Sequence, residues 1–344
     1  MPNFLSSLAN FDGIHYLLIA QRGYAQHEQA FFPLYPLIIK MLAPIFFNNT
    51  LLAALVVSNI SLFFALFMLL KYIGLISPGS NKFLLILTVL VFPTSFYFGA
   101  VYTEGLFFFL FVVCLYFLKK RNYFLAGFFA FLASLTRLVG VFIIIPIIFH
   151  LLNRKPIPTN SRRQQTNSAN FKLILTVISP ILGLFVYCLY LWYTTGDPLL
   201  FFHSQPTFGA NRSTRLIFLP QVYFRYLKIF LTANMNFQYL VSVFEFLVFN
   251  LVFIVLIFDL LRNFKLKIIN LDRLGLALFS VANLLLPTLT GTLSSMPRYA
   301  LLSVSFFIFI TEIKNHWFKA VIWSILAVFH ILALGFFIQG YFVS

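Results

Sequence analysis

The residues best suited to chemistry in this sequence are charged side chains that interrupt long apolar runs. Asp12 lies in the stretch FDGIHY, and its spacing of three from His15 places both side chains on one face if the segment is helical. A carboxylate among Phe11, Tyr16 and Tyr24 would be partly desolvated, which suits a general base that takes a proton from a hydroxyl. The alternative is a helix N-cap Asp followed by Gly, with no chemical role.

A second acid, Glu104, follows Tyr102 and Thr103 in the stretch FPTSFYFGAVYTEG. Pro93 in this stretch predicts a kink in a membrane helix. An acid at the end of a membrane helix is costly unless it is hydrated or paired, whereas the helix dipole favours an acid in the first turn. Glu104 is therefore either a site residue or a helix-terminal acid.

Two arginines stand next to apolar segments, Arg137 in SLTRLVG and Arg298 in SSMPRY. The guanidinium fork suits a phosphate or a carboxylate, so a lipid phosphate and Glu104 are the candidate partners of Arg137. The alternative for both arginines is that their side chains extend to the lipid headgroups.

The segment 194–237 combines polar and aromatic residues. Its polar members include Asp197, His203, Gln205, Arg212 and Arg215. This combination suits a sugar-binding surface, but an interfacial loop has the same composition.

The composition indicates an all-α, multi-pass integral membrane protein, because 61% of the residues are apolar and only 9% are charged. Short alternating segments typical of a transmembrane barrel are absent from the sequence. The formal net charge of +16 does not indicate a nucleic-acid partner, because the cations lie in short loops between apolar runs. Cys114 and Cys188 both fall in apolar runs, so we expect no disulfide.

About ten membrane segments are predicted within a single domain that covers residues 1–344. They are 51–71, 83–98, 104–118, 123–136, 138–152, 173–193, 238–261, 274–290, 299–312 and 320–341. The predicted inner loops are 119–122, 153–172, 262–273 and 314–319. With Lys71 and Lys82 these loops hold 16 of the 24 Lys and Arg residues, which assigns them to the cytoplasmic side.

The stretch 123–152 lies between two inner loops and must cross the membrane an even number of times. Its thirty residues suffice only for two half-length helices that meet near Arg137. One long tilted helix with a misassigned loop is the alternative. With this topology, the candidate site residues and the loop 194–237 all lie on the outer face of the membrane.

Residues 1–50 are predicted to form an outer catalytic loop together with an amphipathic interfacial helix in LIIKMLAPIFF. The alternative for this helix is a simple anchor. About fifty residues then precede the first full helix on the outer side. We expect that a membrane helix before Asn10 is missing, through a misplaced start codon or a truncated gene; otherwise the segment is an N-out tail.

Several other chemistries lack their motifs. The sequence contains no Walker loop, Rossmann glycine pattern or H-E-x-x-H, and no G-x-S-x-G elbow. His15, His27 and Glu28 match no metal-site spacing, so no metal is expected. The main rival function is a membrane transporter or lipid flippase, for which Glu245, the acid deepest in an apolar run, is the only support. A non-catalytic scaffold is a third hypothesis.

Five stretches occur in an order that resembles a known family. They are FDGIHYLLIAQRGY with AFFPLYPLI, FPTSFYFGAVYTEGLF, GFFAFLASLTRLVG, TTGDPLLF and SSMPRYAL, between about residues 11 and 305. Together they look like the PIG-V type mannosyltransferases, the family of the second GPI-anchor mannosyltransferase, and most closely its prokaryotic members. These belong to the GT-C class of membrane glycosyltransferases, which take a sugar from a polyprenyl phosphate on the outer or lumenal face.

The resemblance implies an inverting transfer of mannose from polyprenyl-phosphate mannose to an acceptor hydroxyl on a glycolipid, glycan or protein, in the cell membrane if the source is prokaryotic. It implies that Asp12 and Glu104 are catalytic, and that Arg137 and Arg298 match blocks suited to binding the donor phosphate. Neither a metal nor a nucleotide is required. The substrate-binding candidates are His15, Tyr16, Tyr102, Asp197 and His203. The family has a membrane helix before the Asp, which this sequence lacks.

Overall fold

The computed structural model describes residues 4–153, 164–209, 212–265 and 270–343. Within these ranges the chain is helical and contains no β-strand, which confirms the all-α prediction. Parts of two predicted inner loops, 153–172 and 262–273, lie outside the described residues.

Five of the described helices are long and apolar enough to cross a membrane. These candidate spans are Thr50–Ile76 (α4), Phe171–Thr195 in α9 (Gln164–Thr195), Phe237–Phe264 in α12 (Phe237–Lys265), Leu271–Thr290, which includes α13 (Leu271–Leu285), and His316–Ile338 (α16). Large apolar side chains such as Phe63, Phe258 and Ile331 are exposed along them. Exposed apolar surface of this extent is typical of lipid-facing helices.

The expectation of ten membrane segments is therefore confirmed only in part. The other five segments contain shorter helices: α5 (Lys82–Leu90), α6 (Glu104–Lys119), α7 (Tyr123–Ser134), α8 (Ile144–Leu152) and α15 (Val304–Glu312). Helix α5 ends three residues before Pro93, and residues 299–312 are divided between α15 and the short α14 (Met296–Ala300). Most of α6 is buried, because it packs against α4, α7 and α8. Its apolar sequence reflects contact with protein on all sides.

Asparagines fix the starts of six of the described helices. In each case the side-chain oxygen of the N-cap accepts a hydrogen bond from a backbone N–H in the first turn, which satisfies a donor that has no partner within the helix. The caps are Asn49 of α4, Asn81 of α5, Asn122 of α7, Asn236 of α12, Asn270 of α13 and Asn315 of α16. These helix starts therefore follow from a local signal in the sequence.

The predicted break near Arg137 is present. Helix α7 ends at Ser134, Arg137 has an extended backbone, and a 3-10 helix (Leu138–Ile143) leads into α8. The alternative of one long helix over 123–152 is wrong. The backbone N–H of Leu34 donates to the carbonyl of Leu135 at 3.0 Å, so the break is covered by protein.

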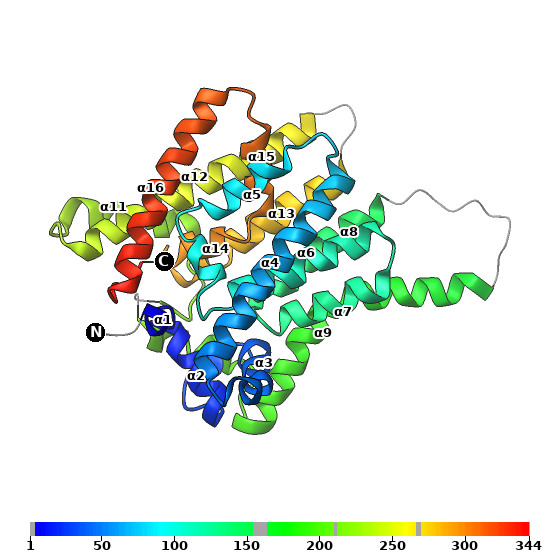
Figure 1. Cartoon of the computed structure of the whole chain (residues 1–344), viewed down its shortest axis with the longest axis horizontal. Helices are drawn as coiled ribbons and strands as arrows, with labels where there is room; N and C mark the ends of the chain where they lie inside the picture. The colour runs from blue at the N-terminus through cyan, green and yellow to red at the C-terminus, as the bar shows by residue number, and fades with distance from the viewer. Residues whose placement is uncertain (1–3, 154–163, 210–211, 266–269, 344) are drawn as a thin grey trace.

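Short elements gather at one end of the bundle, where α1 (Phe4–Ser7), α2 (Asp12–Arg22) and α3 (Leu34–Leu42) lie near both chain ends (Figure 1). Helix α3 buries Tyr35 and Ile39 on one face and exposes Lys40 beside the apolar Leu37 and Met41 on the other, so the exposed face of the predicted amphipathic helix is largely apolar. Helix α11 (Leu219–Thr232) extends from the side of the bundle near this end.

The opposite end holds the basic residues that border the predicted inner loops. Asp272 accepts a hydrogen bond from Lys119 at 2.6 Å and pairs with His150 at 2.6 Å. Arg273 pairs with Asp259 at 3.0 Å and also with Glu312. These contacts bring together the ends of α6, α8, α12, α13 and α15, so the segments that flank the predicted inner loops share one end of the molecule.

Candidate active site

A cavity of about 1290 Å³ opens among the short elements, near the end of the bundle that carries the chain termini. Its wall is built by α2, the break at Arg137, residues 201–208 and 212–216, α11, the start of α12 and the turn before α14. The polar side chains that line it include Asp12, His15, Tyr16, Thr103, Arg137, Gln205, Arg212, Glu245 and Arg298. We call it the large cavity.

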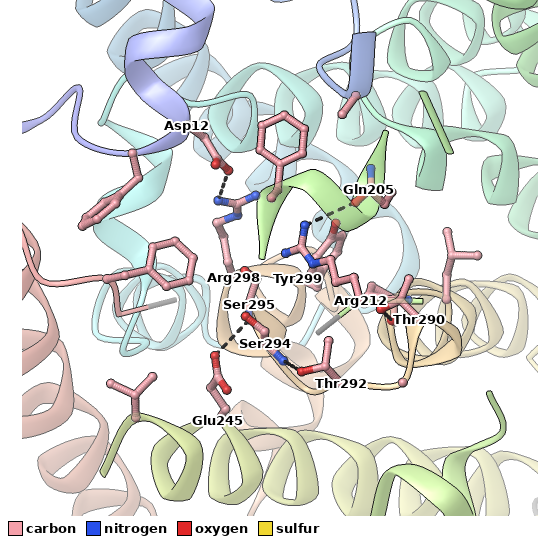
Figure 2. A pocket seen from close by; sticks show the side chains of 18 of the residues that line it. Asp12, Gln205, Arg212, Glu245, Thr290, Thr292, Ser294, Ser295, Arg298 and Tyr299 are labelled. Atoms are coloured by element: carbon pink, nitrogen blue, oxygen red, sulfur yellow. Dashed lines mark hydrogen bonds and ion pairs between the residues drawn. The ribbon is translucent and has the colours of Figure 1, made fainter. Parts of the chain in front are cut away.

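Asp12 is the first residue of α2 and faces the large cavity. Phe11, which precedes it, has a positive φ of 58°, so the chain turns sharply just before the helix. The carboxylate lies at the positive end of the helix dipole. Its side chain is 24% exposed, and Oδ2 accepts a hydrogen bond from Arg298 Nη1 at 2.6 Å (Figure 2). Asp12 is therefore held in place and still accessible from the cavity.

Arg298 connects Asp12 to a second acid. It lies in α14 and is buried, and its Nε is 2.9 Å from Glu104 Oε1. Its guanidinium carbon lies 5.2 Å from the ring centroid of Tyr102 and 5.6 Å from that of Tyr97. These rings are near enough for cation–π attraction, which further fixes the guanidinium.

Glu104 also pairs with Arg137, which donates to its Oε1. Arg137 donates in addition to Thr103 Oγ1 at 3.1 Å, and its guanidinium carbon lies 4.9 Å from the ring centroid of Tyr299. Arg137 is thus paired with Glu104, one of its two predicted partners. For both buried arginines the alternative of extension to lipid headgroups is wrong, because each is fixed by carboxylates inside the protein.

Glu104 is completely buried and does not line the large cavity. It begins α6, so its carboxylate is both a helix-terminal acid and the counter-charge of two arginines. The side chain is behind Arg137 and Arg298 and does not reach the space a substrate would occupy. The structure therefore does not place Glu104 in the cavity, as a catalytic role would require, and its observed contacts are those of a counter-charge to the two arginines.

The four groups form a cluster whose formal charges cancel, with Asp12 and Glu104 opposing Arg137 and Arg298. Burial raises the pKa of Asp12, but the positive charge and hydrogen bond of Arg298, with smaller influences from Arg212 and His15, together outweigh it, and the net pKa is below the ordinary value. Asp12 is therefore ionised at neutral pH. Burial and the negative charge of Asp12 raise the pKa of Tyr16, so this phenol stays neutral and can donate a hydrogen bond into the cavity.

His15 also lines the large cavity, on the face of α2 that it was predicted to share with Asp12. Its Nδ1 is 3.2 Å from Glu28 Oε1, and its ring stacks on Phe31 with centroids 5.0 Å apart. Arg22 pairs with the same carboxylate oxygen at 2.9 Å. Within the described part of the chain, no group of three His, Cys, Asp or Glu residues is arranged to hold a metal ion.

Three predicted substrate-binding residues do not line the large cavity. Tyr102 is buried beneath Arg298 and donates its hydroxyl hydrogen to the carbonyl of Asn10 at 2.7 Å. Asp197 and His203 pair with each other at 2.6 Å on the surface. The charges of Asp197 and His203 indicated that the loop is polar, but not whether these two side chains point into the cavity or away from it. Of that group, His15 and Tyr16 alone face the cavity.

Two further cavity residues were not assigned to a site by the sequence. Glu245 lies in α12, accepts hydrogen bonds from the backbone of Ser295 at 3.1 Å and from Tyr226 at 3.2 Å, and is buried (Figure 2). Its position as an acid in an apolar helix was the only available signal. Arg212 donates to Gln205 at 3.2 Å and carries no distinguishing local pattern.

No family model, no curated protein and no solved structure matches this chain.

Proposed function

We propose that this chain is an inverting membrane glycosyltransferase that moves a hexose, with mannose the first candidate, from a polyprenyl-phosphate donor to an acceptor hydroxyl. In this proposal Asp12 is the general base and the reaction occurs on the outer face of a cell membrane in a GT-C type fold. The observation that supports it most directly is an ionised, accessible carboxylate fixed by Arg298 at the wall of a cavity of about 1290 Å³.

The volume of the cavity supports a reaction between two bulky substrates. Pockets for single small molecules occupy about 300–1,000 Å³, and the large cavity exceeds that range. Its wall includes apolar side chains such as Phe237, Val241 and Phe342 beside the polar ones. A lipid-linked sugar presents both kinds of surface, and so does a glycolipid acceptor.

The proposed step is a direct displacement. The acceptor hydroxyl gives its proton to the Asp12 carboxylate as its oxygen bonds to the anomeric carbon. The bond from that carbon to the phosphate oxygen breaks, and its electron pair leaves with the phosphate. The leaving phosphate is a stable anion and needs no strong acid, so removal of the acceptor proton is the main chemical task for the protein. General base catalysis typically contributes about 10²–10⁴-fold.

Transport is the second candidate function, and the buried Glu245 in a candidate spanning helix is the observation that favours it. Glu245 binds Ser295 and Tyr226 at the wall of the large cavity. A separate cavity of about 330 Å³ lies among Ile76, Arg262 and Arg273. A transport path would have to join the two cavities, whereas glycosyl transfer needs only the large one.

The test is sugar transfer in membranes that hold this chain, supplied with radiolabelled polyprenyl-phosphate mannose. Label is followed into lipid, glycan and protein fractions for wild type, Asp12→Asn and Asp197→Asn. We expect transfer to fall about 10²–10⁴-fold in Asp12→Asn and to be unchanged in Asp197→Asn, whose side chain is outside the cavity.

Equal transfer by Asp12→Asn and wild type would remove Asp12 from catalysis. Movement of a labelled lipid or solute across the membrane without covalent transfer of label would favour the transporter. The loss in Asp12→Asn counts only if the variant elutes as a folded protein in detergent, as wild type does.

A further inference from the structure

The phosphate of the donor needs a cation whose charge is not already neutralised. Arg137 and Arg298 do not meet this requirement, because Glu104 pairs with both and Asp12 pairs with Arg298. A phosphate placed against Arg298 would also lie next to the negative charge of Asp12. The cluster therefore holds the base in position but offers little net attraction for an anion.

Arg212 differs from these two arginines. It lines the same cavity, and its hydrogen bond, 3.2 Å long, goes to the neutral side chain of Gln205. Among the described residues no carboxylate forms an ion pair with it. Figure 2 shows Arg212 beside the pocket, apart from the Asp12–Arg298 pair. Its positive charge is one of the smaller influences that lower the pKa of Asp12, after burial, which raises it, and Arg298. Arg212 is therefore near the base without being bound to it.

The wall around Arg212 is basic. Arg225 and Lys228 of α11 also line the cavity, and neither pairs with a carboxylate in the described part of the chain. Arg225 donates to the carbonyl of Gly291 at 3.0 Å, and its guanidinium fills the space in which a side chain at Gly291 would project. Glu245, the acid on this side, is bound by Ser295 and Tyr226. An anion here meets excess positive charge.

The geometry of an inverting displacement requires the base and the cation that binds the leaving phosphate to lie apart. The base acts on the acceptor at one face of the sugar, and the leaving group departs from the opposite face. In inverting glycoside hydrolases the two groups with these roles lie about 6.5–9.5 Å apart for this reason. Arg298 is 2.6 Å from the Asp12 carboxylate and therefore lies on the acceptor side. A cation for the leaving group must come from elsewhere on the cavity wall.

We infer that Arg212 is the principal phosphate-binding residue of the large cavity, in place of Arg137 and Arg298. This inference rests on the proposed function for the identity of the anion, a phosphodiester linked to a polyprenyl chain. The guanidinium would bind the phosphate in the donor and stabilise the charge that develops as the bond to the anomeric carbon breaks. Gln205 would orient the guanidinium through its side-chain carbonyl.

The experiment measures binding of radiolabelled polyprenyl phosphate, and of the uncharged polyprenol, to the purified full chain in detergent. The variants are Arg212→Gln, Arg212→Lys and the control Arg215→Gln, an exposed arginine three positions away that does not line the cavity. We expect Arg212→Gln to weaken phosphate binding about 10-fold or more and to leave polyprenol binding unchanged. Arg212→Lys should retain part of the affinity, because it keeps the charge but loses the fork.

The comparison of phosphate with alcohol separates a charge effect from a folding defect, which would weaken both ligands. Equal polyprenyl phosphate binding by Arg212→Gln and wild type would overturn the inference, as would an equal loss in Arg215→Gln. A wild type that binds polyprenyl phosphate through Arg212 but transfers no sugar would leave the inference standing and overturn the proposed function. Normal sugar transfer with an unchanged donor KM in Arg212→Gln would overturn the inference and leave the proposed function standing.

Discussion

Arg298 Nη1 lies 2.6 Å from Asp12 Oδ2, although 286 positions separate the two residues in the chain. The pair joins α14 to the start of α2, and Glu104 extends it to α6 through Arg298 Nε at 2.9 Å. Three distant parts of the chain thus meet at one buried cluster beside the large cavity. The consequences of this arrangement can be measured for stability as well as for catalysis.

Glu104→Gln should destabilise the protein strongly. Removing one partner of a buried ion pair typically costs about 3–5 kcal/mol, because a charge is left buried without compensation, and Glu104 is the counter-charge of two arginines. Thermal unfolding followed by size-exclusion chromatography in detergent measures the effect. Asp197→Asn is the control, since its partly exposed pair with His203 should contribute at most about 1 kcal/mol.

A second substitution tests whether charge is the cause. Arg137→Met in the Glu104→Gln background removes one uncompensated cation and should restore part of the lost stability. The opposite outcome is that Arg137→Met lowers stability equally in wild type and in the Glu104→Gln background. In that case the two residues do not interact energetically.

The pH dependence of transfer should show that Arg298 holds Asp12 ionised. Burial raises the pKa of Asp12, but Arg298, with smaller influences from Arg212 and His15, outweighs burial, so the folded pKa lies below the ordinary 3.8. The stability from this pair is present above pH 3.8 and is lost as pH falls through the lower folded pKa. Above pH 3.8, wild-type kcat/KM should therefore show no acid limb from Asp12.

Arg298→Gln leaves burial opposed only by the smaller influences of Arg212 and His15, so the pKa of Asp12 should rise and the acid limb should move to higher pH. Arg298→Lys keeps the charge and should keep the limb low. Measuring kcat/KM against pH for the three proteins tests this sequence of effects. Identical acid limbs in wild type and Arg298→Gln would show that Arg298 does not control the ionisation of Asp12.

Gly105→Ala should impair folding, whereas Gly335→Ala should not. A Cβ at Gly105 would lie 2.4 Å from the carbonyl oxygen of Phe98 and 2.9 Å from that of Ser58. Both contacts are backbone atoms, so the first turn of α6, which begins at Glu104, would have to shift, at a cost of about 1–3 kcal/mol or more. Gly335 is also helical but meets no atom within 4 Å, so alanine there should be neutral or stabilising. Comparable melting temperatures of both variants would contradict the close α4–α6 contact.

Cysteine labelling tests the side of the membrane on which the large cavity opens. The background carries Cys114→Ala and Cys188→Ala. Thr214→Cys places a cysteine beside Arg212, and Lys120→Cys places one at the opposite end of the bundle. Both positions are exposed. We expect a membrane-impermeant maleimide added to intact cells to modify the cysteine at 214 and to reach that at 120 only after lysis. The reverse pattern would place the proposed reaction on the inner face.

Local sequence patterns determined much of the helical framework. The apolar runs indicated an all-α membrane protein, Pro93 marked the region after α5, and the two basic loops around 123–152 required the break at Arg137. The asparagine caps are local signals of the same kind. These features depend on residues within one segment of the chain and its neighbouring loops, so the sequence carries them directly.

The surroundings of the helices and the partners of the charges depended on tertiary structure. An apolar run is the same whether it faces lipid or protein, so the sequence indicated a segment at 104–118 but did not show that α6 would be surrounded by other helices. Asp12, Arg137 and Arg298 could be named because charged residues are rare here, but their pairing requires contacts between segments far apart in the chain. Asp197 was also a rare acid, yet it lies on the surface, because loop packing decides which way a side chain points. The same reason applies to Arg212, which the sequence does not distinguish from Arg215 and which only the folded loop brings to the cavity.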